Sequence, residues 1–499
     1  MPGGRTSLNH DATYVIRVHP GALYLPNVVP ENASKPIDGI SRVATKFEAL
    51  YPDTRIEFVG APPQREWLVT QLSGGQAPDI IQVNVEDVWQ DIQKNWYVPL
   101  DAFLTAPNPF IKPGDPGSMR WDDLWKYPIP TEGTRAPDGK MYCIVLDMIE
   151  TGIYYNKDIF NELGLDVPKD WVEFLATQQK VKDAGYKTPL LVDRSAIADW
   201  GVDLIFDQVY HELRPLLDMQ FEESRGEYLK GYLDWDEIIF LHQKGFFQPG
   251  DPRWPEVWRI LKKWRPYMSE DLTSTDFVKE FFTQKSPMYW MHSHLVSKLV
   301  RDPDRAFEWG IFYLPHIPKS YSTFAGHTDE MAVIGGSGTQ YHVTKSAVSD
   351  TDPKLPFQQQ IDESERLKRV IAWLQFLTVP ENATTVVNET VALLPNVKGA
   401  KPHDELLPFH RFLQQHYSMT KWMYTFDLQF QEVLQRMLEL YLNGNMSEEE
   451  FLGWLETNIK AGSSTIIRRK NPDLSKFQLI WNQRAEMRKQ FEGLPDAAK

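Results

Sequence analysis

Residues 79–83 read DIIQV, a nearly continuous apolar run with the composition of a strand buried on both faces. Two more strands are predicted upstream, YVIRVH at Tyr14–His19 and RIEFV at Arg55–Val59. A helix is predicted between those two strands, over residues 38–51, and a second helix precedes DIIQV, over residues 67–72. Strands and helices therefore alternate, which predicts an α/β layer with right-handed crossovers.

A second unit is predicted to begin near Asp147. The segment Ile153–Asn156 reads as a strand, and a helix opens at Asp170 with a glutamate three residues later, the spacing of a capping box. Ser447–Glu450 has the same spacing at the start of a late helix. With 499 residues, the chain has room for two large α/β domains.

Composition and charge exclude several classes of protein. The chain carries 53 basic and 68 acidic residues, a net charge of −15, whereas a nucleic-acid binder needs a basic surface. The longest apolar run that we find, residues 141–146, is far shorter than the roughly 18 residues that span a bilayer. Cys143 is the single cysteine, which excludes an intramolecular disulfide. We therefore expect neither nucleic acid as a partner nor a transmembrane segment.

No motif of a known catalytic or phosphate-binding class is present. The sequence lacks the nucleophile elbow, the phosphate-binding loop, the dinucleotide fingerprint and the zinc-protease motif. His292 and His294 are two residues apart, but a metal site would need a third ligand nearby. We expect no metal, no cofactor and no catalysis. The 17 Trp, 20 Tyr and 26 Phe residues could form a core, a stacking site for a ligand, or both.

Five segments, in order, resemble the family 1 extracytoplasmic solute-binding proteins of ABC importers, the group that contains maltose- and other oligosaccharide-binding proteins. They are Leu72–Val83 (LSGGQAPDIIQV), Asp138–Phe160 (with YYNKDIF), Leu163–Gly185, Phe281–Met288 and Thr328–Val348. The YYNKD block followed by a Trp–Glu–Phe helix is the most specific of these matches.

This resemblance implies a type II-like periplasmic-binding-protein fold, in which two α/β lobes each carry a central sheet flanked by helices. Lobe one would comprise residues 1–147 and 336–393, and lobe two residues 148–335 and 394–499. A hinge would join the lobes, with glycines 335, 336 and 338 at the second crossing of the chain.

Sugar binding requires aromatic faces for the C–H surfaces of a pyranose and planar polar groups for its hydroxyls. The resemblance places ligand-binding residues at Asn84, Glu86, Asp87, Asp147, Glu150, Trp290, His292, His294, His327, Asp329, Trp422 and Tyr424. Four of these positions have alternatives: Trp290 could pack in the core, and Asn84 could be a turn residue bonded to its own backbone. Asp147 and Glu150 could be simple surface charges.

The function implied by the resemblance is the capture of a sugar, an oligosaccharide, in an interlobe cleft for ABC-type import. The partners would be the permease subunits, and the binding protein itself would be a monomer. Its location would be extracytoplasmic, either periplasmic or lipid-anchored, with the leader already removed from this chain. Two alternatives remain open: a binding protein for a peptide or phosphodiester, and a glycoside-active enzyme that uses paired carboxylates.

Overall fold

The computed structural model describes residues 12–499 except 31–32, 63–64, 127–135, 137, 220–231, 234, 304, 326–334, 410–420 and 423–427. The chain divides into two compact units. Unit one comprises Met1–Glu150, Ser293–Pro303 and Gly336–Leu413, and unit two comprises Thr151–His292, Asp304–Gly335 and Gln414–Lys499. Among the described residues, no helix has both the length and the apolar character that crossing a membrane would require.

The unit boundaries differ from the predicted lobe boundaries at three places. The chain leaves unit one after Glu150, three residues later than expected, and residues 394–413 belong to unit one. A short excursion, Ser293–Pro303, returns to unit one in the middle of the unit-two sequence. This excursion carries helix α13 (Leu295–Arg301), and no local sequence pattern indicates that a helix belongs to one unit or the other.

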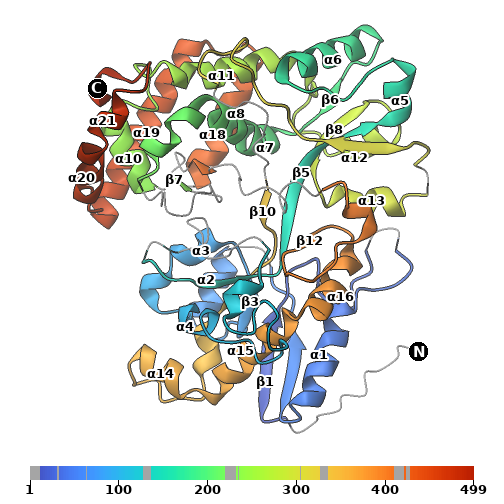
Figure 1. Ribbon diagram of the computed structural model, residues 1–499, viewed down its shortest axis with the longest axis vertical. Coiled ribbons are helices and arrows are strands. Elements are labelled where there is room, and N and C mark those ends of the chain that lie inside the picture. The colour runs from blue at the N-terminus through green and yellow to red at the C-terminus, as the bar shows by residue number, and fades with distance from the viewer. Residues whose placement is uncertain are drawn as a thin grey trace. The chain divides into compact units, whose positions relative to one another are not determined.

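Unit one is built on a five-stranded sheet of order β2-β1-β3-β11-β4 (Figure 1). Its strands are β1 (Tyr14–His19), β2 (Thr54–Phe58), β3 (Ile80–Gln82), β4 (Cys143–Val145) and β11 (Gln340–Val343). The first three strands are mutually parallel, as the alternating pattern predicts, whereas β11 runs antiparallel to both of its neighbours.

Helices cover this sheet and bury the apolar stripes that the sequence predicts. They are α1 (Gly39–Leu50), α2 (Arg65–Ser73), α3 (Val85–Trp89), α4 (Asp101–Leu104), α13, α14 (Phe357–Glu363), α15 (Glu365–Leu377) and α16 (Pro380–Thr390). Helix α1 lies beside β1 in Figure 1 and packs against α15 and α16. Its buried face includes Ile40, Val43, Ala44 and Phe47, which recur at helical spacing.

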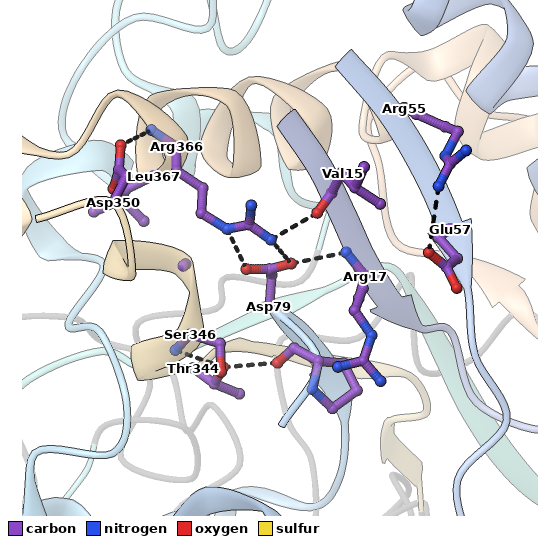
Figure 2. Close-up of polar contacts among 12 residues, drawn as sticks. Val15, Arg17, Arg55, Glu57, Asp79, Thr344, Ser346, Asp350, Arg366 and Leu367 are labelled. Atoms are coloured by element: carbon purple, nitrogen blue, oxygen red, sulfur yellow. Dashed lines mark hydrogen bonds and ion pairs between the residues drawn. The ribbon is translucent and has the colours of Figure 1, made fainter. Parts of the chain in front are cut away.

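One buried ion pair fastens α15 to the base of the unit-one sheet (Figure 2). The Arg366 guanidinium donates to both oxygens of Asp79, at 2.8 and 2.7 Å, and to the Val15 carbonyl at 2.6 Å. Asp79 immediately precedes β3 and also accepts the Arg17 backbone N–H at 2.7 Å. Because Asp79 is only 1% exposed, its charge depends on these donors for solvation.

The second sheet has six strands and is built around β5 (Asp147–Asn156), the strand within which the chain passes from one unit to the other. Within unit two, β5 pairs antiparallel with β8 (Met288–His292) and with β9 (Trp309–Phe312). Strand β6 (Leu190–Leu191) lies parallel to β8. The strand predicted over residues 330–334 lies outside the described residues.

Helices make up most of unit two and share one large aromatic core. They are α5 (Lys157–Glu162), α6 (Trp171–Asp183), α7 (Arg194–Ala196), the π-helix η3 (Ile197–Gly201), α8 (Val202–Tyr210), α9 (Arg214–Leu217), α10 (Trp235–Gln243), α11 (Arg253–Trp264), α12 (Phe277–Phe282), α18 (Leu428–Leu442), α19 (Glu448–Lys470), α20 (Ser475–Gln483) and α21 (Ala485–Arg488). Helix α11 carries Trp254, Trp258 and Trp264 at helical spacing, and all three are buried.

Candidate functional site

The carboxyl end of β3 forms a polar rim on unit one. Asn84 stands at the N-cap position of α3, where its side chain is exposed and makes no capping hydrogen bond. The alternative of a turn residue bonded to the start of this helix is therefore not realised, and the amide faces solvent. Glu86 follows on α3, but its side chain is not among those described.

Asp87, the third acidic or amide residue predicted on this rim, is half-buried beside an arginine. Arg65 Nη1 lies 3.5 Å from Asp87 Oδ1, and Arg65 Nη2 lies 2.8 Å from Asp91 Oδ2. Asp91 is 1% exposed, so its carboxylate holds the buried side of the Arg65 guanidinium. The rim thus presents an amide, a carboxylate and a guanidinium, groups that can bond to hydroxyls.

Two side chains of β11 hold the turn between β3 and α3. Gln340 Oε1 accepts the Val85 N–H at 2.8 Å. The buried His342 ring lies with Nδ1 2.9 Å from the Tyr142 carbonyl and Nε2 3.1 Å from the Val83 carbonyl. Burial lowers the pKa of His342 to about 4, so the ring is neutral at pH 7. These contacts position the rim, and no local sequence pattern predicts them.

Asp147 and Glu150, predicted to accept sugar hydroxyls, are both fully buried. Asp147 accepts the Tyr24 hydroxyl at 2.5 Å and the Thr339 N–H at 2.8 Å, all within unit one. Burial raises the pKa of Asp147 to about 6. The Glu150 carbonyl accepts the Ser293 N–H at 2.8 Å. Both oxygens of Asp147 therefore already have donors, which favours a structural role for that residue.

A group of aromatic side chains lies at one end of β8 in unit two. Trp290 is 1% exposed, and its ring centroid lies 5.8 Å from those of Trp200 and Trp264. These contacts match the packing alternative for Trp290. His292 is half-buried, with its ring centroid 5.9 Å from Trp200, and burial lowers its pKa to about 4.

Trp200 is the tryptophan of this group that remains partly exposed. It lies on the π-helix η3, between α7 and α8, and Asp193 caps the segment by accepting the Ala196 N–H at 2.7 Å. Single π-helical turns inside helices occur frequently at functional sites, because the extra residue redirects the side chains. Trp200 is not among the predicted site residues, because no spacing in the sequence distinguishes it from the other tryptophans of this helical region.

The remaining predicted residues either belong to different units or lie outside the described residues. His292 belongs to unit two and His294, at the start of α13, to unit one. Across the part of the chain that the structure describes, no three His, Cys, Asp or Glu side chains form a group that could hold a metal. Trp422 lies in β13 (Lys421–Trp422), and its side chain is not described. His327, Asp329 and Tyr424 lie outside the described residues.

The chain forms two α/β units and passes between them repeatedly. Unit one has a polar rim and unit two has a partly exposed indole, and these features together define the class of two-lobe solute-binding proteins. The family model described as bacterial extracellular solute-binding protein matches residues 33–384. The chain belongs to this family, which confirms the resemblance stated above and implies an extracytoplasmic location. The members of the family are binding proteins.

Individual relatives agree with this assignment. The chain is 26% identical over 201 residues to the multiple sugar-binding protein of Streptococcus mutans, a match that covers 40% of this chain and 42% of the relative. Two solved structures share the fold at 17% identity. They are the cyclic α-maltosyl-1,6-maltose binding protein of Arthrobacter globiformis (TM-score 0.58, covering 91% of this chain and 99% of that one) and RafE in complex with raffinose (TM-score 0.57, 90% and 100%). These likenesses confirm the two-lobe fold.

Proposed function

We propose that this chain binds a sugar, and specifically an oligosaccharide, for ABC-type import. The observation that carries the proposal is the partly exposed Trp200 indole. Its ring contacts the neutral His292 on one side and packs against the buried Trp290. A flat aromatic surface of this kind covers the apolar face of a pyranose, and the rigid ring behind it holds the indole in place.

The polar groups of unit one support the same proposal. Asn84 offers an exposed amide, and Asp87 with Arg65 offers a carboxylate and a guanidinium at the same rim. Sugar hydroxyls both donate and accept, so a ligand of this class would be matched by such a mixed set. Glu86, Glu150, His292, His294, His327, Asp329, Trp422 and Tyr424 stay predictions as ligand contacts.

The relatives support a sugar as the ligand over a peptide or phosphodiester, because they include a multiple sugar-binding protein and a protein in complex with raffinose. By the same reasoning, we propose that the partners are ABC permease subunits, that the protein acts as a monomer without catalysis, and that it is periplasmic or lipid-anchored.

The proposal is tested by a thermal-shift panel of raffinose, stachyose, maltooligosaccharides and chitin oligosaccharides, with peptides and glycerol phosphodiesters as controls. A bound sugar at a hundredfold excess over Kd stabilises the native state by about 2.7 kcal/mol. A saturable shift with one sugar series, without release of reducing ends, is the expected result. Shifts confined to the control compounds would contradict sugar binding and favour the non-sugar alternative.

Replacing Trp200 by alanine tests the residue that carries the proposal. The loss of one stacking face, worth about 1 kcal/mol, should weaken the affinity for the sugar found in the panel by about fivefold. Trp454 provides a matched control, because it is another half-buried tryptophan of unit two and packs against Phe430 and Phe451. In calorimetric titrations, unchanged binding by Trp200→Ala, or equal weakening in Trp454→Ala, would remove Trp200 from the site.

A further inference from the structure

Asp147 lies where the chain is about to leave unit one, and it contacts the segment by which the chain returns. The chain leaves unit one after Glu150 and re-enters at Gly336. The Asp147 carbonyl accepts the Gly338 N–H at 3.0 Å, and its carboxylate accepts the Thr339 N–H at 2.8 Å. The backbone and side chain of one residue thus join the outgoing and returning segments.

Close packing around Gly338 allows this arrangement. A Cβ atom at Gly338 would lie 2.5 Å from Asp147 Oδ1, so any larger residue would push the returning segment away from the carboxylate. On the other side, the Tyr24 hydroxyl donates to Asp147 Oδ2 at 2.5 Å. Tyr24 comes from the loop after β1, which makes the carboxylate a junction of three segments of unit one.

No cation neutralises this carboxylate among the described residues. The titratable groups that face it are two buried phenols, Tyr24 and Tyr341, and the Tyr341 hydroxyl donates to the Pro20 carbonyl at 3.0 Å. Lys126 is the nearby ammonium, but its Nζ donates to the carbonyls of Pro395 and Ala400, at 3.0 and 2.9 Å. Pro395 lies opposite Asp147 in the pairing of β12 (Leu394–Pro395) with β5.

We propose that Asp147 is a positioning residue, an ionisable latch whose protonation state sets how readily the outgoing and returning segments of unit one separate. Ionisation places a charge in a fully buried site with only hydrogen bonds to solvate it, so the charged form favours any opening that admits water. The neutral form keeps the same contacts, because the carboxyl can then donate to the Tyr24 oxygen. The latch is therefore tighter when it is protonated.

The sign and size of the effect follow from linkage. The pKa of Asp147 is raised by burial from 3.8 to about 6, so the closed latch binds a proton more tightly than the opened one. The opening constant should rise as the pH increases from about 4 to about 6.5, by up to about 100-fold, and should level off above that range. Over this range, opening becomes easier as the carboxyl ionises.

Amide hydrogen exchange of the full chain without sugar tests the latch. We expect protection in the peptide that covers residues 336–343, corrected for intrinsic exchange, to decrease between pH 5 and 6.5 and then to level off. Asp147→Asn copies the neutral form and should keep the protection of the wild type at acid pH throughout. Tyr24→Phe removes a donor to the charged form, so its decrease should extend to higher pH.

Asp251 provides a matched control in unit two. It is also buried, accepts the Tyr210 hydroxyl at 2.6 Å, and has a pKa raised by burial. Asp251→Asn should leave the pH profile of residues 336–343 as in the wild type. A profile that is flat in the wild type, or that has the same slope in Asp147→Asn, would overturn the proposal.

A consequence for ligand binding rests on the proposed function. For a sugar identified in the panel, affinity should depend on pH across the same range in the wild type and should not do so in Asp147→Asn. If no sugar binds, the proposed function fails while the exchange profile still decides the latch. If a sugar binds but the exchange profile is flat, the latch fails alone.

Discussion

The Trp290 indole is 1% exposed and lies between the rings of Trp200 and Trp264. Trp290 is predicted to contact the ligand because of its position in the family pattern, but its surroundings in the structure favour a role in the core. Trp200, whose ring contacts that of Trp290, is partly exposed and lies on a π-helix. The two tryptophans are therefore expected to respond differently to truncation, one in stability and the other in binding.

Trp290→Ala should lower the free energy of unfolding by about 3–5 kcal/mol, because it leaves a cavity in the core of unit two. Urea denaturation followed by circular dichroism measures this loss. Trp200→Ala is the comparison, with an expected loss of stability well below that of Trp290→Ala. A Trp290→Ala variant that is as stable as the wild type would show that the indole is not a core residue.

At the scale of the elements, α15 is joined to the sheet of unit one by a side chain at its first turn. Arg366 donates to Asp79, and the Arg17 N–H donates to the same carboxylate (Figure 2). Ser364 caps the helix by accepting the Leu367 N–H at 2.9 Å. The start of the helix is thus fixed to the residue that precedes β3, at the end of that strand opposite the polar rim.

Arg366→Met should destabilise the protein by about 3–5 kcal/mol, because it leaves the buried Asp79 charge without its bidentate donor. Urea denaturation again gives the loss. The double variant Arg366→Met with Asp79→Asn should recover part of it, since the unpaired charge is then removed. Equal losses in the single and double variants would mean that the ion pair contributes little.

Several elements could be predicted from sequence because their signals are local. Tyr14–His19 forms β1 as expected, and the predicted helix over residues 38–51 is α1. The capping box at Ser447 is present, with Glu450 bonded back to it. Caps and apolar periodicity involve residues within a few positions of each other, which a single sequence records directly.

At the scale of the whole molecule, each unit contains a histidine that burial holds neutral, a fully buried one in unit one and a partly buried one in unit two. Burial lowers the pKa of His342 in unit one and of His292 in unit two to about 4, from an ordinary value of 6.5. Because the folded state resists protonation, the stability from these groups is complete above pH 6.5 and is lost as the pH falls towards 4.

His342→Gln should reduce the loss of unfolding free energy on acidification from pH 7.5 to 4. The loss approaches about 3 kcal/mol for each such histidine. Asp147 acts in the opposite direction, but equally in both proteins, so the difference between wild type and variant isolates His342. Urea denaturation at a series of pH values measures it, and identical slopes in the two proteins would contradict the prediction.

The candidate site was less predictable than the elements, for reasons that are not local. Asn84 lies at a rim because it follows a strand, and this the sequence indicates. The burial of Asp147 depends on Tyr24 and Thr339, which are far from it in the chain. The exposure of Trp200 depends on a π-helical turn, which has no sequence signature comparable to a cap.

The sheet order of unit one has a consequence for how the protein is made. Strand β11 lies between β3 and β4, pairing Ile81 with His342 and Cys143 with His342 on its other side. A nascent chain that has emerged only as far as β4 therefore lacks the strand that joins β4 to the rest, and β4 stays unpaired with that sheet until residues 146–343 have been translated. The order of synthesis cannot be the order of folding, and the N-terminal unit completes its sheet late, through its most distant contacts.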